Sequence, residues 1–136
     1  EVSRWIESAL DQAVAGGLIN DERYIRDKVR GYLRRGASAR GIAHKLRAKG
    51  IPQEQVYAAI DELAESGMNL QWISVAAYVR RRRMGPFRTR VVDPIEHRRK
   101  DLGRLGRAGF PMDLAYKILD MDVEEIEEIA FERRFI

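Results

Sequence analysis

The sequence predicts an all-α fold, and three observations lead to this prediction. Apolar residues recur with the spacing of an amphipathic helix along almost the whole chain of 136 residues. No stretch alternates apolar and polar residues for long enough to indicate a strand. Glycine stands at almost every boundary between apolar segments, as is typical of helix C-termini that need a positive φ angle. We therefore expect helices over residues 2–15, 21–35, 38–49, 52–66, 70–84, 93–108, 111–120 and 122–134.

The starts of several helices are marked by capping residues. Asp93 with Glu96, and Asp122 with Glu125, have the spacing of a capping box, in which each side chain satisfies a backbone N–H of the other residue. Proline is tolerated in a first helical turn because no N–H donor is needed there. Three prolines stand at such positions: Pro52, Pro94 and Pro111.

The helices repeat along the chain with a period of about 50 residues. Lys49-Gly50-Ile51-Pro52 resembles Ala108-Gly109-Phe110-Pro111, and the stretch 6–18 resembles 56–68. Such periodicity indicates a helical-repeat array in which neighbouring units bury each other's apolar faces. We assign residues 1–19 to the last helix of a first three-helix repeat, 20–66 to a second repeat, 70–120 to a third and 121–136 to a capping helix.

The net charge of +4 conceals a strong segregation of charge along the chain. Residues 21–49 sum to +7 and residues 80–107 to +8, whereas 1–20, 50–79 and 108–136 sum to −2, −4 and −5. Blocks of one sign create local fields that steer charged partners. The two basic blocks therefore indicate an anionic partner, either nucleic acid or an acidic protein surface.

Helix 21–35 carries a row of arginines opposite its apolar stripe. Four side chains fall within an arc of about 80° on a helical projection: Arg23, Arg26, Arg30 and Arg34. The guanidinium fork matches phosphate and carboxylate groups bidentately, so we interpret the row as a surface for a polyanion, with a solvated helix face as the alternative. The same interpretation extends to Arg80–Arg83, because a helix dipole accounts for one or two C-terminal cations but not four. The complete predicted contact set is Arg23, Arg26, Arg30, Arg34, Arg35, Arg40, Arg47, Arg80, Arg81, Arg82, Arg83, Arg98, Arg99 and Arg104.

The aromatic residues are few and stand mainly at core positions. We expect Trp72 to be a packing anchor, and Tyr24, Tyr32, Tyr78, Phe110 and Tyr116 have core spacing. Apart from Phe87, no aromatic is interleaved with the arginines in the sequence, so base stacking is weakly supported, whereas contact with a phosphate backbone remains open.

No grouping of residues predicts catalysis, a cofactor or a metal site. The chain has no cysteine, and its two histidines, His44 and His97, lack a second histidine at ligand spacing. Neither a glycine-rich phosphate loop nor a Gly-x-Ser-x-Gly motif is present. We therefore expect a non-enzymatic protein without cofactor or metal. The lack of an 18-residue apolar run predicts no membrane span, and the absence of cysteine fits a cytoplasmic location.

Three segments resemble the RecX family of recombinase regulators: Gly17-Leu18-Ile19-Asn20-Asp21-Glu22-Arg23-Tyr24, Leu46-Arg47-Ala48-Lys49-Gly50-Ile51 and Arg107-Ala108-Gly109-Phe110. The resemblance covers essentially the whole chain. The chain departs from the family pattern at Lys45, where the family commonly has Glu, and in the segment 37–41. These departures make the surface details of the family less transferable to this chain.

The resemblance implies tandem three-helix repeats in an elongated, curved right-handed array. It also implies binding to the RecA filament on single-stranded DNA, with inhibition of strand exchange and of the RecA ATPase through blocked filament growth or promoted disassembly, within DNA repair and the SOS response. Some members also contact DNA, and we expect a monomer.

A rival hypothesis is a DNA-binding protein of helix-turn-helix type. Residues 38–63 contain two short helices joined at Gly50-Ile51-Pro52, loosely like that motif. The second helix carries no Lys or Arg from Pro52 to Leu63, which argues against reading of the major groove.

Overall fold

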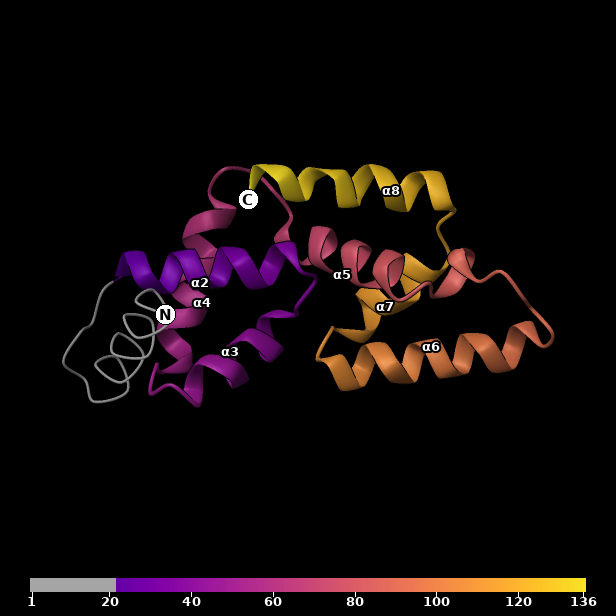
Figure 1. Ribbon diagram of the computed structural model, residues 1–136, viewed down its shortest axis with the longest axis horizontal. Helices are drawn as coiled ribbons and strands as arrows, with labels where there is room; N and C mark the ends of the chain where they lie inside the picture. The colour runs from indigo at the N-terminus through magenta and orange to yellow at the C-terminus, as the bar shows by residue number, and fades with distance from the viewer. Residues whose placement is uncertain (1–21) are drawn as a thin grey trace, which may run out of the picture.

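The computed structural model describes residues 22–136, and these residues form helices and no strand (Figure 1). The α-helices are α2 (Glu22–Arg34), α3 (Ala39–Arg47), α4 (Gln53–Ala64), α5 (Leu70–Arg81), α6 (Pro94–Ala108), α7 (Met112–Leu119) and α8 (Val123–Phe131), with 3-10 turns η1 (Gly85–Phe87) and η2 (Glu132–Phe135). The all-α prediction is thus confirmed. The predicted helix 2–15 and the repeat assigned to residues 1–19 lie outside the described residues. None of the described helices has the length and apolar character needed to cross a bilayer.

The predicted helix starts are largely confirmed. Asp122 accepts a hydrogen bond from the N–H of Glu125 at 2.8 Å, and the Glu125 carboxylate accepts one from the N–H of Asp122 at 3.3 Å, which completes a capping box. At α6 only the first of these bonds forms, from the N–H of Glu96 to Asp93 at 3.2 Å. Asp93 is therefore an N-cap without the reciprocal half of the box.

The two similar segments of the sequence adopt the same local geometry. Gly50 and Gly109 both end a helix in the left-handed region, with φ of 84° and 97°. The next residue, Ile51 or Phe110, donates its N–H five residues back, at 3.1 Å in each case, and its side chain is buried. This is the Schellman arrangement, in which glycine avoids the Cβ penalty. The short repeat in sequence is therefore a repeat in structure.

The end of α5 differs from the prediction of a helix over 70–84. The helix ends at Arg81, and Arg83 has a φ of 53°, the only positive φ of a non-glycine among the described residues. The reversal turns Met84 into the core, where it is completely buried and donates its N–H to Val79. A left-handed residue is needed for that reversal, and here arginine occupies the position despite a cost of about 1–2 kcal/mol. Consequently Arg82 and Arg83 do not continue one helical row with Arg80 and Arg81.

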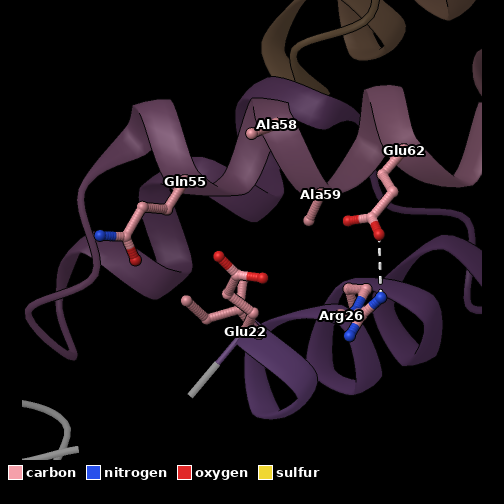
Figure 2. Close-up of a pocket in the computed structure, with 7 residues that line it drawn as sticks. Glu22, Arg26, Gln55, Ala58, Ala59 and Glu62 are labelled. Atoms are coloured by element: carbon pink, nitrogen blue, oxygen red, sulfur yellow. Dashed lines mark hydrogen bonds and ion pairs between the residues drawn. The ribbon is translucent and has the colours of Figure 1, made fainter. Parts of the chain in front are cut away.

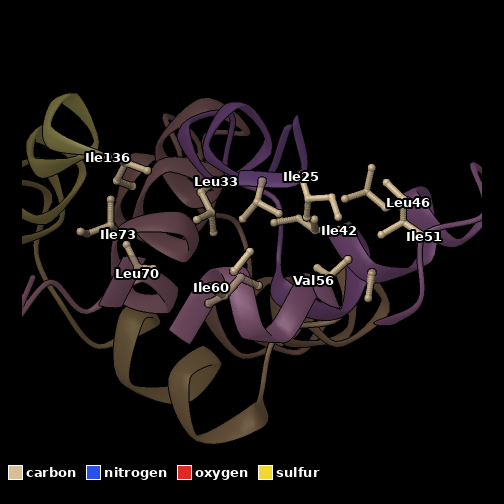
Figure 3. Close-up of a cluster of buried hydrophobic side chains, with 13 residues drawn as sticks. Ile25, Leu33, Ile42, Leu46, Ile51, Val56, Ile60, Leu70, Ile73 and Ile136 are labelled. Atoms are coloured by element: carbon tan, nitrogen blue, oxygen red, sulfur yellow. The ribbon is translucent and has the colours of Figure 1, made fainter. Parts of the chain in front are cut away.

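The buried side chains form two clusters, one on each half of the molecule. The first cluster joins α2, α3 and α4 to the start of α5 (Figure 3). The second joins the rest of α5 to α6, α7 and α8. Helix α5 contributes Ile73 to the first cluster and Val75 and Val79 to the second, so it spans both. This continuous helix fixes how α2–α4 lie relative to α6–α8.

The C-terminal segment connects the two halves from outside. Helix α8 runs alongside α5 in the opposite direction and brings the chain end back toward α2 and α4 (Figure 1). Its Ile126 is buried in the second cluster, whereas Ile136, after η2, is buried in the first. The expected single helix over 122–134 changes to a 3-10 turn at Glu132. The segment expected to cap the array thus packs along α5 over both cores.

The aromatic predictions are confirmed only in part. Phe110 is buried and contacts Tyr78 edge-on at 5.4 Å between ring centroids. Trp72 is half-buried against the second cluster. Tyr116, predicted at a core position, is 49% exposed on α7 and was wrongly placed. The inward face of α7 instead uses Ala115 and Ile118.

Candidate anion-binding cleft

The arginine row of α2 lies on the surface, but much of it is occupied within the protein. Arg26 reaches across to α4 and pairs with Glu62 at 2.9 Å (Figure 2). The pair lines a small pocket of about 180 Å³ between the two helices, to which Glu22 adds a second carboxylate. The pocket thus holds two carboxylates against one guanidinium, which makes it a poor site for an anion.

Two further arginines of this row also have internal partners. Arg30 pairs with Asp27 on the preceding turn at 3.4 Å. Arg34 donates from Nε, at 3.0 Å, and from Nη2 to the main-chain oxygen of Ile136. These contacts tie α2 to itself and to the chain end. The row that the helical projection identified therefore contributes to the fold, and its role toward a partner stays a prediction.

Most arginines of the second basic block are likewise paired. Three surface ion pairs involve this block: Arg80 with Glu127 at 3.4 Å, Arg98 with Asp120 at 2.8 Å and Arg99 with Glu96 at 3.6 Å. Cations also lie over aromatic rings, with Arg35 at 4.9 Å from the Tyr32 centroid and Arg82 at 5.1 Å from that of Tyr78. Arg81 donates to the main-chain oxygen of Arg35 at 3.5 Å.

One buried pair anchors the loop between α5 and α6. Asp101 is only 1% exposed and accepts hydrogen bonds from Arg88 Nε at 3.1 Å and from the N–H of Gly85 at 3.0 Å. The hydrogen bond with Asp101 raises the pKa of Arg88 above its ordinary value, because it stabilises the charged guanidinium. Arg88 is thereby held against the protein and is not part of the free basic surface.

A smaller set of arginines has no acidic, aromatic or main-chain partner in the part of the chain that the structure describes. From the predicted contact set these are Arg40, Arg47, Arg83 and Arg104, to which Arg90 and Arg107 are added. Three members of this set, Arg40, Arg47 and Arg107, line one cleft. The structure thus brings the two basic blocks together at one place.

This basic cleft lies where α3, α4 and the end of α6 meet and has a volume of about 380 Å³. Its side chains come from all three helices. They are Arg40, His44 and Arg47 of α3, Gln53 and Tyr57 of α4, and Arg107 of α6, with Gly41, Ala43, Ala108 and Gly109 completing the wall. No carboxylate lines the cleft, so its electrostatic potential is positive.

The junction of α3 and α6 is held by Ser38, the N-cap of α3. Its Oγ accepts a hydrogen bond from the N–H of Gly41 at 2.9 Å and donates one to the main-chain oxygen of Ala108 at 2.6 Å. Gly109 packs so closely that a Cβ there would stand 2.6 Å from Ser38 Oγ and 3.3 Å from Arg40 Cβ. The end of α6 therefore lies against the start of α3, and Arg107 and Arg40 line the same cleft.

Part of this cleft was predictable from the sequence, and part of it was not. Arg40 and Arg47 belong to the predicted contact set, and Arg107 lies in the second basic block. Tyr57 was not singled out, because its helix α4 carries no arginine or lysine. The only signal in the sequence was the similarity between the 49–52 and 108–111 segments, which places the ends of α3 and α6 in equivalent positions.

The described residues contain no group of three or more acidic, histidine or cysteine side chains that could hold a metal ion. His44 lies in the cleft as an exposed side chain, and the cleft wall contains no carboxylate that could pair with it. The cleft can therefore attract and orient an anion through guanidinium groups, and its residues form no nucleophile–base pair.

Comparison with known proteins shows similarity to bacterial RecX proteins. Residues 20–60 match the family described as RecX, second three-helix domain. A regulatory protein RecX from Myxococcus xanthus is 38% identical over 124 residues, which are 88% of this chain and 63% of that protein. The corresponding protein of Agrobacterium fabrum is 33% identical over 112 residues, 82% of this chain and 56% of that protein. The chain thus spans less than two thirds of the length of these relatives. No solved structure matches it.

Proposed function

We propose that this chain, a member of the RecX family, is a non-enzymatic regulator that binds the RecA filament on single-stranded DNA. Bound there, it inhibits the recombinase and its ATPase by blocking filament growth or promoting disassembly. This role places it in recombinational repair and the SOS response, in the cytoplasm, acting as a monomer. The relatives are named as regulatory proteins, which supports a role in regulation.

One observation supports the proposal most strongly. Arginines of both basic blocks line the same cleft, and none of these arginines has an acidic partner within the described residues. A nucleoprotein filament presents phosphates and acidic protein groups together. Arg40 and Arg47 from the first block and Arg107 from the second can face such a surface at once, because no internal carboxylate competes for them. We also propose the repeat boundaries 20–66 and 70–120 with the terminal segment 121–136. The buried side chains of α2, α3 and α4 in one cluster and those of α6 and α7 in the other support this division, whereas α5 contributes to both clusters.

The rival helix-turn-helix hypothesis has less support. Helices α3 and α4 do pack together across a five-residue connection. The charged side chains of α4 are Glu54, Asp61 and Glu62, all acidic, and a helix of that charge is repelled by the phosphates lining a major groove.

The test is the RecA ATPase on single-stranded DNA, titrated with this protein. We expect inhibition at concentrations comparable to RecA, and no inhibition at a severalfold excess would refute the proposal. Arg47→Glu should weaken the inhibition. Lys117→Glu is the matched control, because it changes the net charge equally on the exposed side of α7 and should inhibit as the unaltered protein does.

A further inference from the structure

We propose that the connection between α5 and α6 carries a second docking surface, separate from the basic cleft. At this surface Val91, Val92 and Ile95, here called the apolar tip, insert into an apolar pocket on an acidic protein surface. The inference rests on the proposed function in one respect, because the protein surface on which it is tested is that of the RecA filament. The length of the connection, the exposure of the tip and the surrounding charge support it.

The connection between α5 and α6 is longer than its counterpart in the preceding repeat. Residues 35–38 join α2 to α3, whereas residues 82–93 join α5 to α6. The first part of the longer connection belongs to the fold, because Met84 is buried and Phe87 packs against the second cluster. The part that follows extends to one end of the molecule (Figure 1). Joining the two helices does not require this extension, and long connections in compact proteins are often functional.

The apolar tip exposes more apolar surface than the fold explains. Val92 and Ile95 are the most exposed large apolar side chains that the structure describes, at 87% and 83%, and Val91 is 54% exposed. Apolar side chains that gather on a surface are typical of interaction sites. Since all three are β-branched and have few rotamers, burying them in a partner costs little conformational entropy.

The tip is held in place on both sides. On the side of α5, buried Asp101 accepts hydrogen bonds from the N–H of Gly85 at 3.0 Å and from Arg88 Nε at 3.1 Å. On the side of α6, Asp93 caps the helix and Pro94 begins it. A segment that is fixed before binding loses less freedom when it binds. The tip can therefore act as a preformed anchor.

The charge around the tip favours an acidic partner. Arg90 directly precedes the tip and Arg83 lies near the start of the same connection. Both are exposed, and neither has an acidic partner within residues 22–136. Arg83 also has a φ of 53°, which glycine adopts without strain. Strain of this kind is common at functional sites, so we assign both guanidinium groups to carboxylates of the partner.

A protein surface fits the tip better than nucleic acid or a membrane does. The tip has no aromatic ring on which an unpaired base could stack. Its three aliphatic side chains also offer little area for burial in a lipid surface, on which the strength of membrane binding depends. An apolar pocket bordered by carboxylates, in contrast, can bury all three side chains and pair with Arg90.

The experiment measures binding of the dye-labelled chain to RecA filaments on single-stranded DNA by fluorescence anisotropy. The double variant Val92→Ser, Ile95→Ser should bind about 10- to 100-fold more weakly, with unchanged dependence on salt because no charge is removed. The double variant Val92→Leu, Ile95→Leu should restore binding. Arg90→Gln should weaken binding less and reduce its dependence on salt.

Arg83→Gly separates a role toward the partner from a role in the fold. Relief of the strained φ should leave the melting temperature unchanged or raise it, whereas loss of the guanidinium should weaken filament binding. A lower melting temperature, or unchanged binding, would contradict the role assigned to Arg83. Phe135→Ser is the matched control for the tip, because it removes a 71% exposed apolar side chain beside α2 and should bind as the unaltered chain does.

The outcomes distinguish this inference from the proposed function. Unchanged filament binding by the serine double variant, shown to be folded by circular dichroism, would overturn the inference alone. An equal loss in Phe135→Ser would also overturn it. If the serine variant instead loses binding to oligothymidylate alone or to phosphatidylserine vesicles, the tip contacts nucleic acid or lipid and the inference is wrong. Tip-dependent filament binding without inhibition of the ATPase would refute the proposed function alone, and no filament binding by the unaltered chain would refute both.

Discussion

Two sets of arginines, both on helices of the first basic block, have opposite surroundings. On α2, Arg26 and Arg34 bind Glu62 and the main chain of Ile136, contacts that hold the molecule together. On α3, Arg40 and Arg47 point into a cleft that no acid enters. Helical spacing thus identifies which side chains lie on the surface, whereas only the neighbours across the fold decide which of them are available to a partner.

The largest expected effect concerns Gly109, which belongs to the wall of the cleft. Gly109→Ala should destabilise the protein by about 2–3 kcal/mol, because alanine is strained at a positive φ and its Cβ would displace the N-cap Ser38. Urea unfolding measures the change. Gly67→Ala is the control, since Gly67 has a similar φ of 90° but nothing within 4 Å of its Cβ position, and it should cost only the backbone strain. Equal losses would show that the contact with Ser38 is unimportant.

The buried pair of Asp101 and Arg88 extends the comparison to an arginine whose guanidinium is bound within the protein. Asp101→Asn should cost about 1.5–3 kcal/mol, because the charged hydrogen bonds to Arg88 are lost inside the protein. Asp120→Asn, which disrupts the exposed pair with Arg98, should cost less than about 1 kcal/mol. Thermal melts of both variants measure the two losses of stability. Similar losses would contradict the expectation that the buried pair contributes more than the exposed pair.

The raised pKa of Arg88 also determines in which direction the stability contributed by this pair changes with pH. The stabilisation is fully present below the ordinary pKa of arginine and is lost only as the pH rises through the raised value. Stability measured from neutral to moderately alkaline pH should therefore show no loss that depends on Arg88. A drop present in the unaltered protein and absent from Arg88→Gln would contradict this.

The direct test of the contrast compares one paired arginine with one unpaired arginine. Arg34→Ala should lower the free energy of unfolding by about 1–2 kcal/mol, because it removes the hydrogen bonds to Ile136 that hold the chain end. Arg47→Ala should change it by no more than about 0.5 kcal/mol. Denaturant titrations of both variants suffice, and if Arg47→Ala were the more damaging one, our distinction between structural and available arginines would be wrong.

The smallest effect is expected at the surface pair between α2 and α4. A double-mutant cycle of Arg26→Gln and Glu62→Gln should give a coupling of about 0.2–1 kcal/mol, because both groups are substantially solvated. A coupling above about 2 kcal/mol would mean that this pair organises the first half of the molecule to an extent that its exposure does not suggest.

Much of the fold was predictable because its signals are local. The capping box at Asp122 and the glycines at helix ends, such as Gly50, depend on hydrogen bonds within a few residues. The end of α5 was not predictable in this way. Its helix-favouring sequence continues past Arg81, but the helix ends there and the chain reverses. The reversal allows Met84 to pack in a core that forms with distant helices.

The candidate site was predictable only as two separate basic blocks. Arg40 and Arg47 were expected to face an anion, and this remains a prediction. In the sequence no aromatic except Phe87 is interleaved with the arginines, but the fold brings Tyr57 into the same cleft as Arg107, from which it is distant in sequence.

Local sequence was sufficient to specify the helical class, the caps, the repeated helix ends and the segregation of charge, since each arises from contacts between near neighbours or from composition alone. The tertiary structure decided which arginines are paired, where the chain end returns and which helices enclose the cleft. These features depend on how α5 spans both cores and on the contact of Gly109 with Ser38. Packing between distant segments sets such relations, and the periodicity of a single helix carries no information about them.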